Sequence, residues 1–179
     1  MAMTAWKITA ADRDVLLGLA KRKMEIAASP LNQERRKLWL SLHGGKCNRP
    51  MVLAEWGGVH EEKNPFAPEL KCQEEWARNI EYGLRCAIWV HEELRDDTVV
   101  EPWHDIGWNI RMSNYGVEPV MHKADNDGHL GARRWDPPLG NLQEDFAKLK
   151  PRTFEVVDRE GTLSWKAFLE ELFAGVMPV

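Results

Sequence analysis

Two short apolar runs separated by one amphipathic segment constrain the fold of this chain more than any other feature. Residues 51–54, Met-Val-Leu-Ala, form an unbroken apolar run, and a second run at 98–102 begins with Thr-Val-Val. Unbroken apolar runs of this length are typical of strands that are covered on both faces. Between them, residues 72–91 carry apolar side chains at steps of three and four, the spacing of an amphipathic helix. Strands that alternate with helices predict an α/β fold with a parallel sheet or barrel.

The N-terminal part carries the signals of two consecutive helices. Thr9 opens a capping box, in which an acidic residue follows three positions later. Ser29 and Pro30 fit the N-cap and the first position of a second helix, which a pair of glycines then closes. We therefore expect a helical extension at 1–45 and a separate region at 46–179.

The second half of the chain begins with an irregular region. Residues 107–140 contain many turn-forming residues and no helical period, and we expect 117–121 to form part of a hairpin or lid. Asn141 fits the N-cap of a short helix over 142–149. A final amphipathic helix is predicted over 165–173.

The last four residues, 176–179, have the composition of a buried strand that has just begun. With the runs at 51–54 and 98–102, they would make about two and a half strand-helix units, which do not close a barrel. The pattern therefore predicts a fragment, natural or engineered, of a larger protein.

Charge and apolar patterning exclude several classes of protein. A net charge of −4 and a pI near 5.9 argue against a nucleic-acid-binding surface, which is usually basic. We interpret the short basic clusters at 21–23 and 35–37 as solvated helix faces. No signal peptide is visible, and no apolar run approaches the ~20 residues that span a bilayer. We therefore expect a cytoplasmic protein.

The three cysteines fit neither a disulfide framework nor a zinc ribbon, because their number is odd and no CxxC pair occurs. We interpret them as reduced structural thiols, with Cys72 and Cys86 on one face of the same helix. His43 lies near Cys47, but two ligands are too few for a metal site, so no metal site is predicted in this chain.

Three segments, taken in order, resemble the N-terminal part of the uroporphyrinogen decarboxylase superfamily. They are RPMVLAEWGG (49–58), DDTVVEPWHDIG (96–107) and WDPPLGNLQEDFAKLKP (135–151). The superfamily includes the haem-pathway decarboxylase and many corrinoid-dependent methyltransferases, among them methanol- and methylamine-type enzymes and O-demethylases. The similarity covers nearly all of the chain after about Asn32. It implies a (β/α)8 barrel, a TIM barrel roughly twice as long as this chain, of which only the first units are present.

By this resemblance, 49–56 is the first barrel strand, 98–105 is the second, and 176–179 begins the third. Asp105 matches an aspartate that ends the second strand of the decarboxylase, where it binds the NH groups of the tetrapyrrole and stabilises a cationic intermediate. A carboxylate suits that role, since it offers only acceptors to a ring of donors. Barrel active sites also lie at the C-terminal ends of strands. The resemblance therefore makes Asp105 the candidate catalytic residue.

The segment after the first predicted strand departs from the decarboxylase pattern. The decarboxylase has Arg-Gln-Ala-Gly-Arg there, and its arginines hold substrate carboxylates, whereas this chain has Ala-Glu-Trp-Gly-Gly at 54–58. An acid at this place would repel a polycarboxylate. The resemblance therefore implies corrinoid-dependent methyl transfer as the parent activity, with tetrapyrrole decarboxylation, a lyase reaction, as the alternative.

The methyltransferase branch uses a zinc ion, whose ligands lie in the second half of the barrel. We therefore expect this chain to hold no cofactor and to be inactive alone, while the complete parent would use zinc and take its methyl group from a corrinoid protein or a small molecule. We expect no nucleic-acid or membrane partner. A further alternative is a non-catalytic fragment that forms a homo-oligomer through the open edge and apolar face of an incomplete barrel.

Five further residues are candidates for substrate binding: Glu55, Trp56, Glu101, Trp103 and His104. Glu101 and Trp103 alternate with Asp105 along the predicted strand, so they would face the same side. His104 would face the opposite side, toward the outer helices or the rim. The two residues that follow the first predicted strand would border the same pocket.

Overall fold

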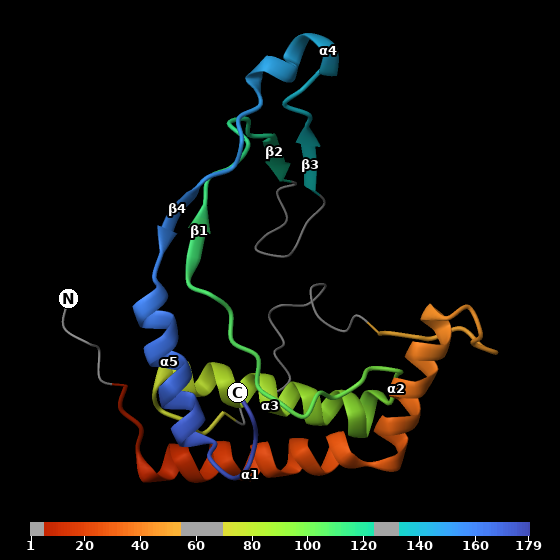
Figure 1. Cartoon of the computed structure of the whole chain (residues 1–179), viewed down its shortest axis with the longest axis vertical. Coiled ribbons are helices and arrows are strands. Elements are labelled where there is room, and N and C mark those ends of the chain that lie inside the picture. Colours follow the sequence, from red (N-terminus) through yellow and green to blue (C-terminus); the bar gives the residue numbers. More distant parts are fainter. Residues whose placement is uncertain (1–5, 55–69, 124–132) are drawn as a thin grey trace. The chain divides into compact units, whose positions relative to one another are not determined.

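The structure is a computed structural model, and Figure 1 shows it as a mixed α/β protein. The residues that it describes are 6–54, 70–123 and 133–179. They contain five α-helices and two separate two-stranded antiparallel sheets, and no helix among them is long and apolar enough to cross a membrane. They divide into two compact units. Unit 1 comprises 6–54, 70–106 and 164–179, and unit 2 comprises 107–123 and 133–163.

Two capped helices begin unit 1. The hydroxyl of Thr9 caps α1 (Ala10–Ala28) by accepting a hydrogen bond from the backbone nitrogen of Asp12 at 3.0 Å. Ser29 ends α1 and caps α2 (Pro30–His43), with its Oγ 3.2 Å from the backbone nitrogen three residues further on. Each cap satisfies a backbone donor that a helix start leaves unpaired. The two predicted N-terminal helices are therefore confirmed.

The third helix, α3 (Glu75–Trp89), packs against α1 and continues as a π-helix, η3 (Val90–Leu94). Its amphipathic spacing buries Ala77, Ile80 and Leu84 on one face. This long helix is the one that the sequence predicts between the two apolar runs, although it begins later than expected.

Two buried carboxylates keep residues 71–74 out of α3. The carboxylate of Asp12 accepts hydrogen bonds from the backbone nitrogens of Gln73 and Glu74, at 3.1 and 3.4 Å. Glu81, which is fully buried, accepts from the first two backbone nitrogens of the 71–74 segment, at 2.9 Å each. Because Cys72 lies before the helix, the predicted shared helix face of Cys72 and Cys86 is wrong. All three cysteines are free thiols.

The core of unit 1 lies between α1, α3 and the C-terminal part of α5 (Arg159–Leu172). Its buried apolar residues are Leu16, Ala20, Cys72, Ala77, Ile80, Leu84, Leu169, Leu172, Phe173 and Met177. Full burial of a side chain such as Leu16 or Phe173 contributes about 1.5–3 kcal/mol. Trp76 and Trp165 extend the core, with ring centroids 5.3 Å apart in an edge-to-face arrangement.

The helix α5 begins six residues before its predicted start, because Asp158 provides a cap. The carboxylate of Asp158 accepts a hydrogen bond from the backbone nitrogen of Gly161 at 2.8 Å. A Cβ atom on residue 161 would lie 2.2 Å from the same carboxylate, so only glycine fits there without a shift. The apolar spacing over 165–173 identifies the buried part of the helix and not its solvated first turn.

Unit 2 is built from two antiparallel strand pairs. The pairs are β1 (Ile110–Met112) with β4 (Phe154–Val157), and β2 (Val120–Lys123) with β3 (Arg133–Asp136). The expected β piece at 117–121 overlaps β2, which begins at Val120 and pairs with β3. Asn141 caps the short helix α4 (Leu142–Asp145), which ends in a 3-10 turn, η4 (Phe146–Lys148).

The predicted barrel strands are not strands in the part of the chain that the structure describes. Neither 51–54 nor 98–105 has regular strand pairing there, and no parallel sheet is present among the described residues. Side chains take the place of neighbouring strands: Asn32 bonds to the backbone nitrogen of Val100 at 2.8 Å, and Asp97 bonds to the 51–54 segment. A parallel strand needs a row of backbone partners. The α/β prediction is therefore right only at the level of a mixed α/β fold.

Candidate functional site

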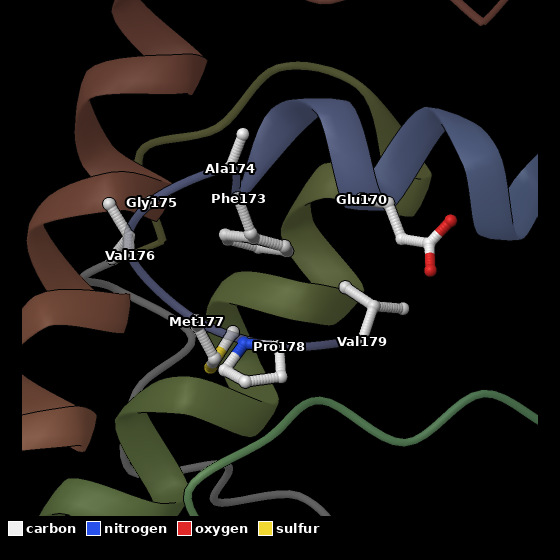
Figure 2. Close-up of a pocket in the computed structure, with 8 residues that line it drawn as sticks. All are labelled: Glu170, Phe173, Ala174, Gly175, Val176, Met177, Pro178 and Val179. Atoms are coloured by element: carbon white, nitrogen blue, oxygen red, sulfur yellow. The ribbon is translucent and has the colours of Figure 1, made fainter.

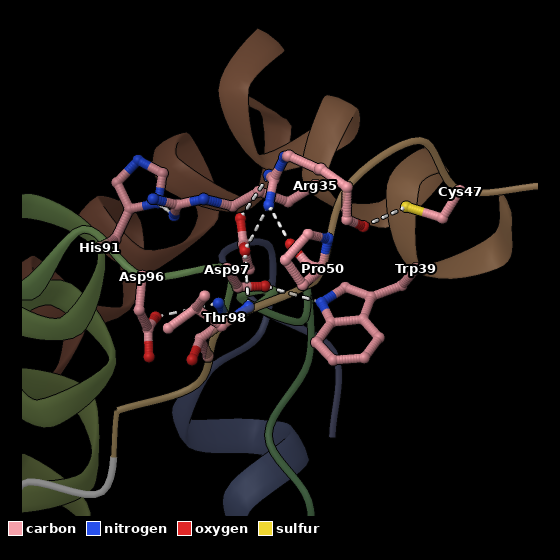
Figure 3. A network of polar contacts seen from close by, with 10 residues as sticks. Arg35, Trp39, Cys47, Pro50, His91, Asp96, Asp97 and Thr98 are labelled. Atoms are coloured by element: carbon pink, nitrogen blue, oxygen red, sulfur yellow. Dashed lines mark hydrogen bonds and ion pairs between the residues drawn. The ribbon is translucent and has the colours of Figure 1, made fainter. Parts of the chain in front are cut away.

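A dense polar network fixes the start of the segment that carries the predicted site residues (Figure 3). The carboxylate of Asp97 accepts hydrogen bonds from both terminal nitrogens of Arg49 at 2.7 Å and from the backbone nitrogen of Val52 at 2.8 Å. The bonds from Arg49 lower the pKa of Asp97 to about 2, against the opposing effect of burial. The indole of Trp39 donates to the carbonyl of Asp97 at 2.7 Å. This network ties residues 49–54 to the start of the 98–105 segment.

Asp105 lies at the other end of that segment and is exposed. Its Oδ1 accepts a hydrogen bond from the indole nitrogen of Trp103 at 2.9 Å. The two side chains therefore lie on the same side of the chain, as their separation of two residues predicts. Trp103 is itself partly exposed, so the pair presents an aromatic ring and a carboxylate side by side.

Lys23 reaches this pair from α1, and its ammonium group donates a hydrogen bond to the carbonyl of Trp103. Burial lowers the pKa of Lys23, while the carboxylates of Asp105 and Glu101 raise it. Lys23 is therefore half-buried, whereas Lys21 and Arg22 are exposed, as expected of a solvated helix face. A signal was available in the sequence, since Lys23 lies three residues after Ala20 on the buried stripe of α1.

Glu101 contacts α2, where its carboxylate forms an ion pair with the guanidinium group of Arg36. Arg35, which precedes Arg36 on α2, is buried, and its guanidinium nitrogen lies 2.9 Å from the Nδ1 atom of His91. The expected solvated face at 35–37 is therefore wrong for Arg35. Glu101 joins the segment to α2, and it also lies close enough to Lys23 to affect the pKa of that amine.

His104 faces the C-terminal end of unit 1. Its backbone nitrogen donates to the carbonyl of Pro178 at 2.8 Å, and its ring lies 5.9 Å from the ring of Phe173. Burial lowers the pKa of His104 below its ordinary 6.5, and the nearby Lys23 cation lowers it further, whereas Asp105 raises it. The imidazole of His104 therefore packs against the ring of Phe173, in surroundings that disfavour its protonated form.

A pocket lies at the end of α5 (Figure 2). It has a volume of about 480 Å³, and its lining is Glu170, Phe173, Ala174, Gly175, Val176, Met177, Pro178 and Val179. Glu170 contributes the only charged side chain to this lining. The pocket shares Phe173 and Pro178 with the contacts of His104. An apolar group with one cationic or hydrogen-bond-donating substituent suits such a lining.

Two predicted site residues, Glu55 and Trp56, lie outside the described residues. Among 6–54, 70–123 and 133–179, no group of three His, Cys, Asp or Glu side chains is placed to hold a metal ion. His43 and Cys47 instead contact backbone carbonyls, at 2.9 and 3.1 Å. The described part of the candidate site brings together the carboxylate of Asp105, the amine of Lys23 and the indole of Trp103, with the imidazole of His104 next to Asp105 in the chain.

Comparison with known proteins found no matching family model, no matching curated protein and no matching solved structure.

Proposed function

We propose that this chain is the N-terminal part of a uroporphyrinogen-decarboxylase-like (β/α)8 enzyme whose activity is corrinoid-dependent methyl transfer. One observation carries the proposal: the three segments predicted as consecutive barrel strands are neighbours in space. The backbone nitrogen of Asp97 donates to the carbonyl of Val52 at 2.9 Å, and that of His104 donates to the carbonyl of Pro178 at 2.8 Å. The middle segment therefore contacts the third through His104, and Asp97, the residue that precedes it, contacts the first. The second strand of a barrel likewise lies beside the first and the third.

The position of Asp105 supports the same proposal. It ends the middle segment and is exposed, and barrel enzymes carry their sites at the C-terminal ends of strands. Lys23 and Trp103 hold the backbone and the carboxylate in place from two sides. On this proposal, Asp105 accepts hydrogen bonds from a substrate or stabilises positive charge as it develops.

The described residues do not fit the zinc ion that the methyltransferase branch implies, because they bring no three suitable ligands together. We therefore assign no metal ligand in this chain. The zinc and the corrinoid partner belong to the proposed complete enzyme.

The test begins with the reading frame downstream of codon 179. The complete product is purified, and loss of the methyl group from methylcobalamin in the presence of a thiol is followed by absorbance. Asp105→Asn is expected to lower kcat by about 100-fold or more, as removal of one charge-stabilising group does. Asp14→Asn, which changes an exposed carboxylate on α1, is the matched control and should leave kcat unchanged.

Three results would contradict the proposal. One is a reading frame that stops at codon 179, and another is methyl transfer that Asp105→Asn does not affect. The third is decarboxylation of uroporphyrinogen by the complete product, which would establish the lyase alternative instead.

A non-catalytic, self-associating chain is the second candidate, and one observation favours it. Val52 and Leu53, in the first predicted strand, are 58% and 56% exposed although both are apolar. An apolar strand segment without a covering layer is prone to pair with another chain. Leu53→Asp should then abolish self-association measured by sedimentation, and a chain that stays monomeric at every concentration would exclude this candidate.

A further inference from the structure

The contact between Arg35 of α2 and His91 of η3 fixes the protonation state of the imidazole (Figure 3). A guanidinium nitrogen of Arg35 lies 2.9 Å from the Nδ1 atom of His91. A guanidinium group has only donors and keeps its charge in proteins, so Nδ1 must accept this hydrogen bond. A ring whose Nδ1 accepts is neutral, with its proton on Nε2. The contact therefore exists only with the neutral form of His91.

The charges around His91 oppose its protonation. Arg35 is 4% exposed, so solvent screens its charge little. Glu92 is the neighbouring carboxylate that favours a protonated ring, but it is paired with Arg22 of α1 at 2.6 Å, and Arg22 also binds Glu25 at 2.8 Å. Burial lowers the pKa of His91 below its ordinary 6.5, and the two arginine cations lower it further, whereas Glu92 raises it.

Negative charge on its other neighbours keeps Arg35 in place. Arg35 lies close enough to Asp96 and Asp97 to stabilise their charged forms. Both carboxylates also accept hydrogen bonds from backbone nitrogens of the 51–54 segment, at 2.9 and 2.8 Å. A protonated His91 would lose its hydrogen bond and repel Arg35, while these carboxylates still attract Arg35. The imidazole is therefore the partner that would move away.

The turn that carries His91 depends on contacts from outside. η3 is a π-helix, a rare form that occurs mostly as a single turn. The backbone nitrogen of Arg95 closes it by donating to the carbonyl of Val90 at 2.9 Å. Arg95 has a φ of 56°, in the left-handed region that is costly for a residue with a Cβ atom. Arg35 and Arg22 join this turn to α2 and α1.

From this geometry we propose that His91 and Arg35 form a pH-sensitive latch, which holds η3 against α2 while the imidazole is neutral and releases η3 when the imidazole is protonated. The stabilisation that the latch provides is complete above about pH 6.5 and is lost as the pH falls through the lower native pKa of His91. This inference is independent of the proposed enzymatic activity.

Nuclear magnetic resonance of the unsubstituted chain tests the contact directly. At neutral pH the nitrogen chemical shifts of His91 should show an unprotonated Nδ1 and a protonated Nε2, and the ring should titrate below pH 6.5. A proton on Nδ1 at neutral pH, or a midpoint at or above 6.5, would overturn the proposal.

Hydrogen exchange of the Arg95 amide tests the release, because that amide closes the π-helical turn. His91→Gln keeps an acceptor for Arg35 but cannot be protonated, and His43→Gln replaces an exposed histidine of α2 as the matched control. Protection of the amide, corrected for the intrinsic exchange rate at each pH, should fall in the unsubstituted chain and in His43→Gln as the pH falls through the midpoint of His91. Linkage sets the size of this fall at about tenfold for each unit by which that midpoint lies below 6.5. In His91→Gln the fall should be absent.

Two results of the exchange experiment would overturn the proposal. One is protection that does not change with pH in the unsubstituted chain, and the other is an equal fall in His91→Gln. If His91→Gln does not fold, the unsubstituted chain still decides, since the fall in Arg95 protection must have the size that the measured His91 midpoint sets.

Discussion

Replacement of Asn32 by alanine removes the side chain that holds the backbone of Val100 in place. The Oδ1 atom of Asn32 accepts a hydrogen bond from the nitrogen of Val100 at 2.8 Å. Its Nδ2 atom donates to the carbonyls of Val100 and Ala27 at 3.0 Å each. Asn32 is fully buried and Val100 is 3% exposed, so water does not compete for these groups in the native state.

The expected loss follows from a count of the groups that the substitution leaves unpaired. The carbonyl of Ala27 keeps a partner, because the side chain of Gln33 donates to it at 2.7 Å. The nitrogen and the carbonyl of Val100 lose the partner that Asn32 provides. An unsatisfied buried polar group costs about 1–3 kcal/mol, so the two groups make Asn32→Ala lower the free energy of unfolding by about 2–6 kcal/mol. That is a large share of the roughly 5–15 kcal/mol that stabilises a typical domain.

Urea unfolding followed by circular dichroism measures this loss, and Gln33→Ala is the control. Gln33 is exposed and shares its acceptor with Asn32, so its removal should cost about 0.5 kcal/mol or less. The exchange rate of the Val100 amide gives a local readout and should rise in Asn32→Ala alone. If Asn32→Ala and Gln33→Ala were equally stable, the view that Asn32 substitutes for a neighbouring strand would be refuted.

Two further predictions concern buried carboxylates. Asp97→Asn should destabilise the protein at neutral pH, because the native pKa of about 2 lies below the ordinary 3.8 and the charged form is bound to Arg49. The stabilisation by the carboxylate is complete above about pH 4 and is lost as the pH falls through about 2. The difference in free energy of unfolding between Asp97→Asn and the unsubstituted protein, measured with urea, should therefore shrink over that range. A difference that stays constant would contradict this prediction. Glu81→Gln should cost about 3 kcal/mol, because it removes a fully buried charge that Arg85 balances at 2.9 Å. Thermal unfolding checks this against Glu93→Gln, an exposed control, and equal melting temperatures would contradict it.

The helices could be predicted from the sequence because their signals are local. The caps at Thr9, Ser29 and Asn141 each depend on a hydroxyl or amide oxygen and a backbone nitrogen two or three residues away. The start of α3 was placed too early, since the carboxylate of Asp12 that removes its predicted first turn lies about sixty residues away in the chain. A pattern within a short window of sequence cannot reveal a contact between Asp12 and residues so far along the chain.

The strands could not be predicted in the same way, because strand pairing depends on which segments become neighbours. The apolar runs at 51–54 and 98–102 favour buried strands, yet in the described structure neither has regular strand pairing. Val52 bonds to the carboxylate and the backbone nitrogen of Asp97, and Val100 bonds to the side chain of Asn32. Conversely, β1 and β4 are exposed, and β1, with three residues inside the turn-rich region 107–140, is too short for a local pattern to identify.

Within the candidate site, a separation of two residues predicts that Trp103 lies beside Asp105. The spacing of Lys23 from Ala20 indicates that Lys23 faces inward, but no local pattern identifies Trp103, 80 residues away, as its partner.

The position of Asp105 depends on the helices of unit 1 and not on a sheet. The segment that leads to it is held by Asn32 and Arg36 from α2 and by Lys23 from α1, which lie 65 to 80 residues earlier in the chain. Each is one side chain acting on one or two groups, whereas a strand in a sheet is held by a row of backbone hydrogen bonds. Loss of one of these three side chains therefore removes every bond that it makes to its part of the segment, whereas a strand in a sheet keeps the other backbone hydrogen bonds of its row. It follows that substitutions on the inner faces of α1 and α2, which do not touch Asp105, should displace its carboxylate as effectively as changes beside it.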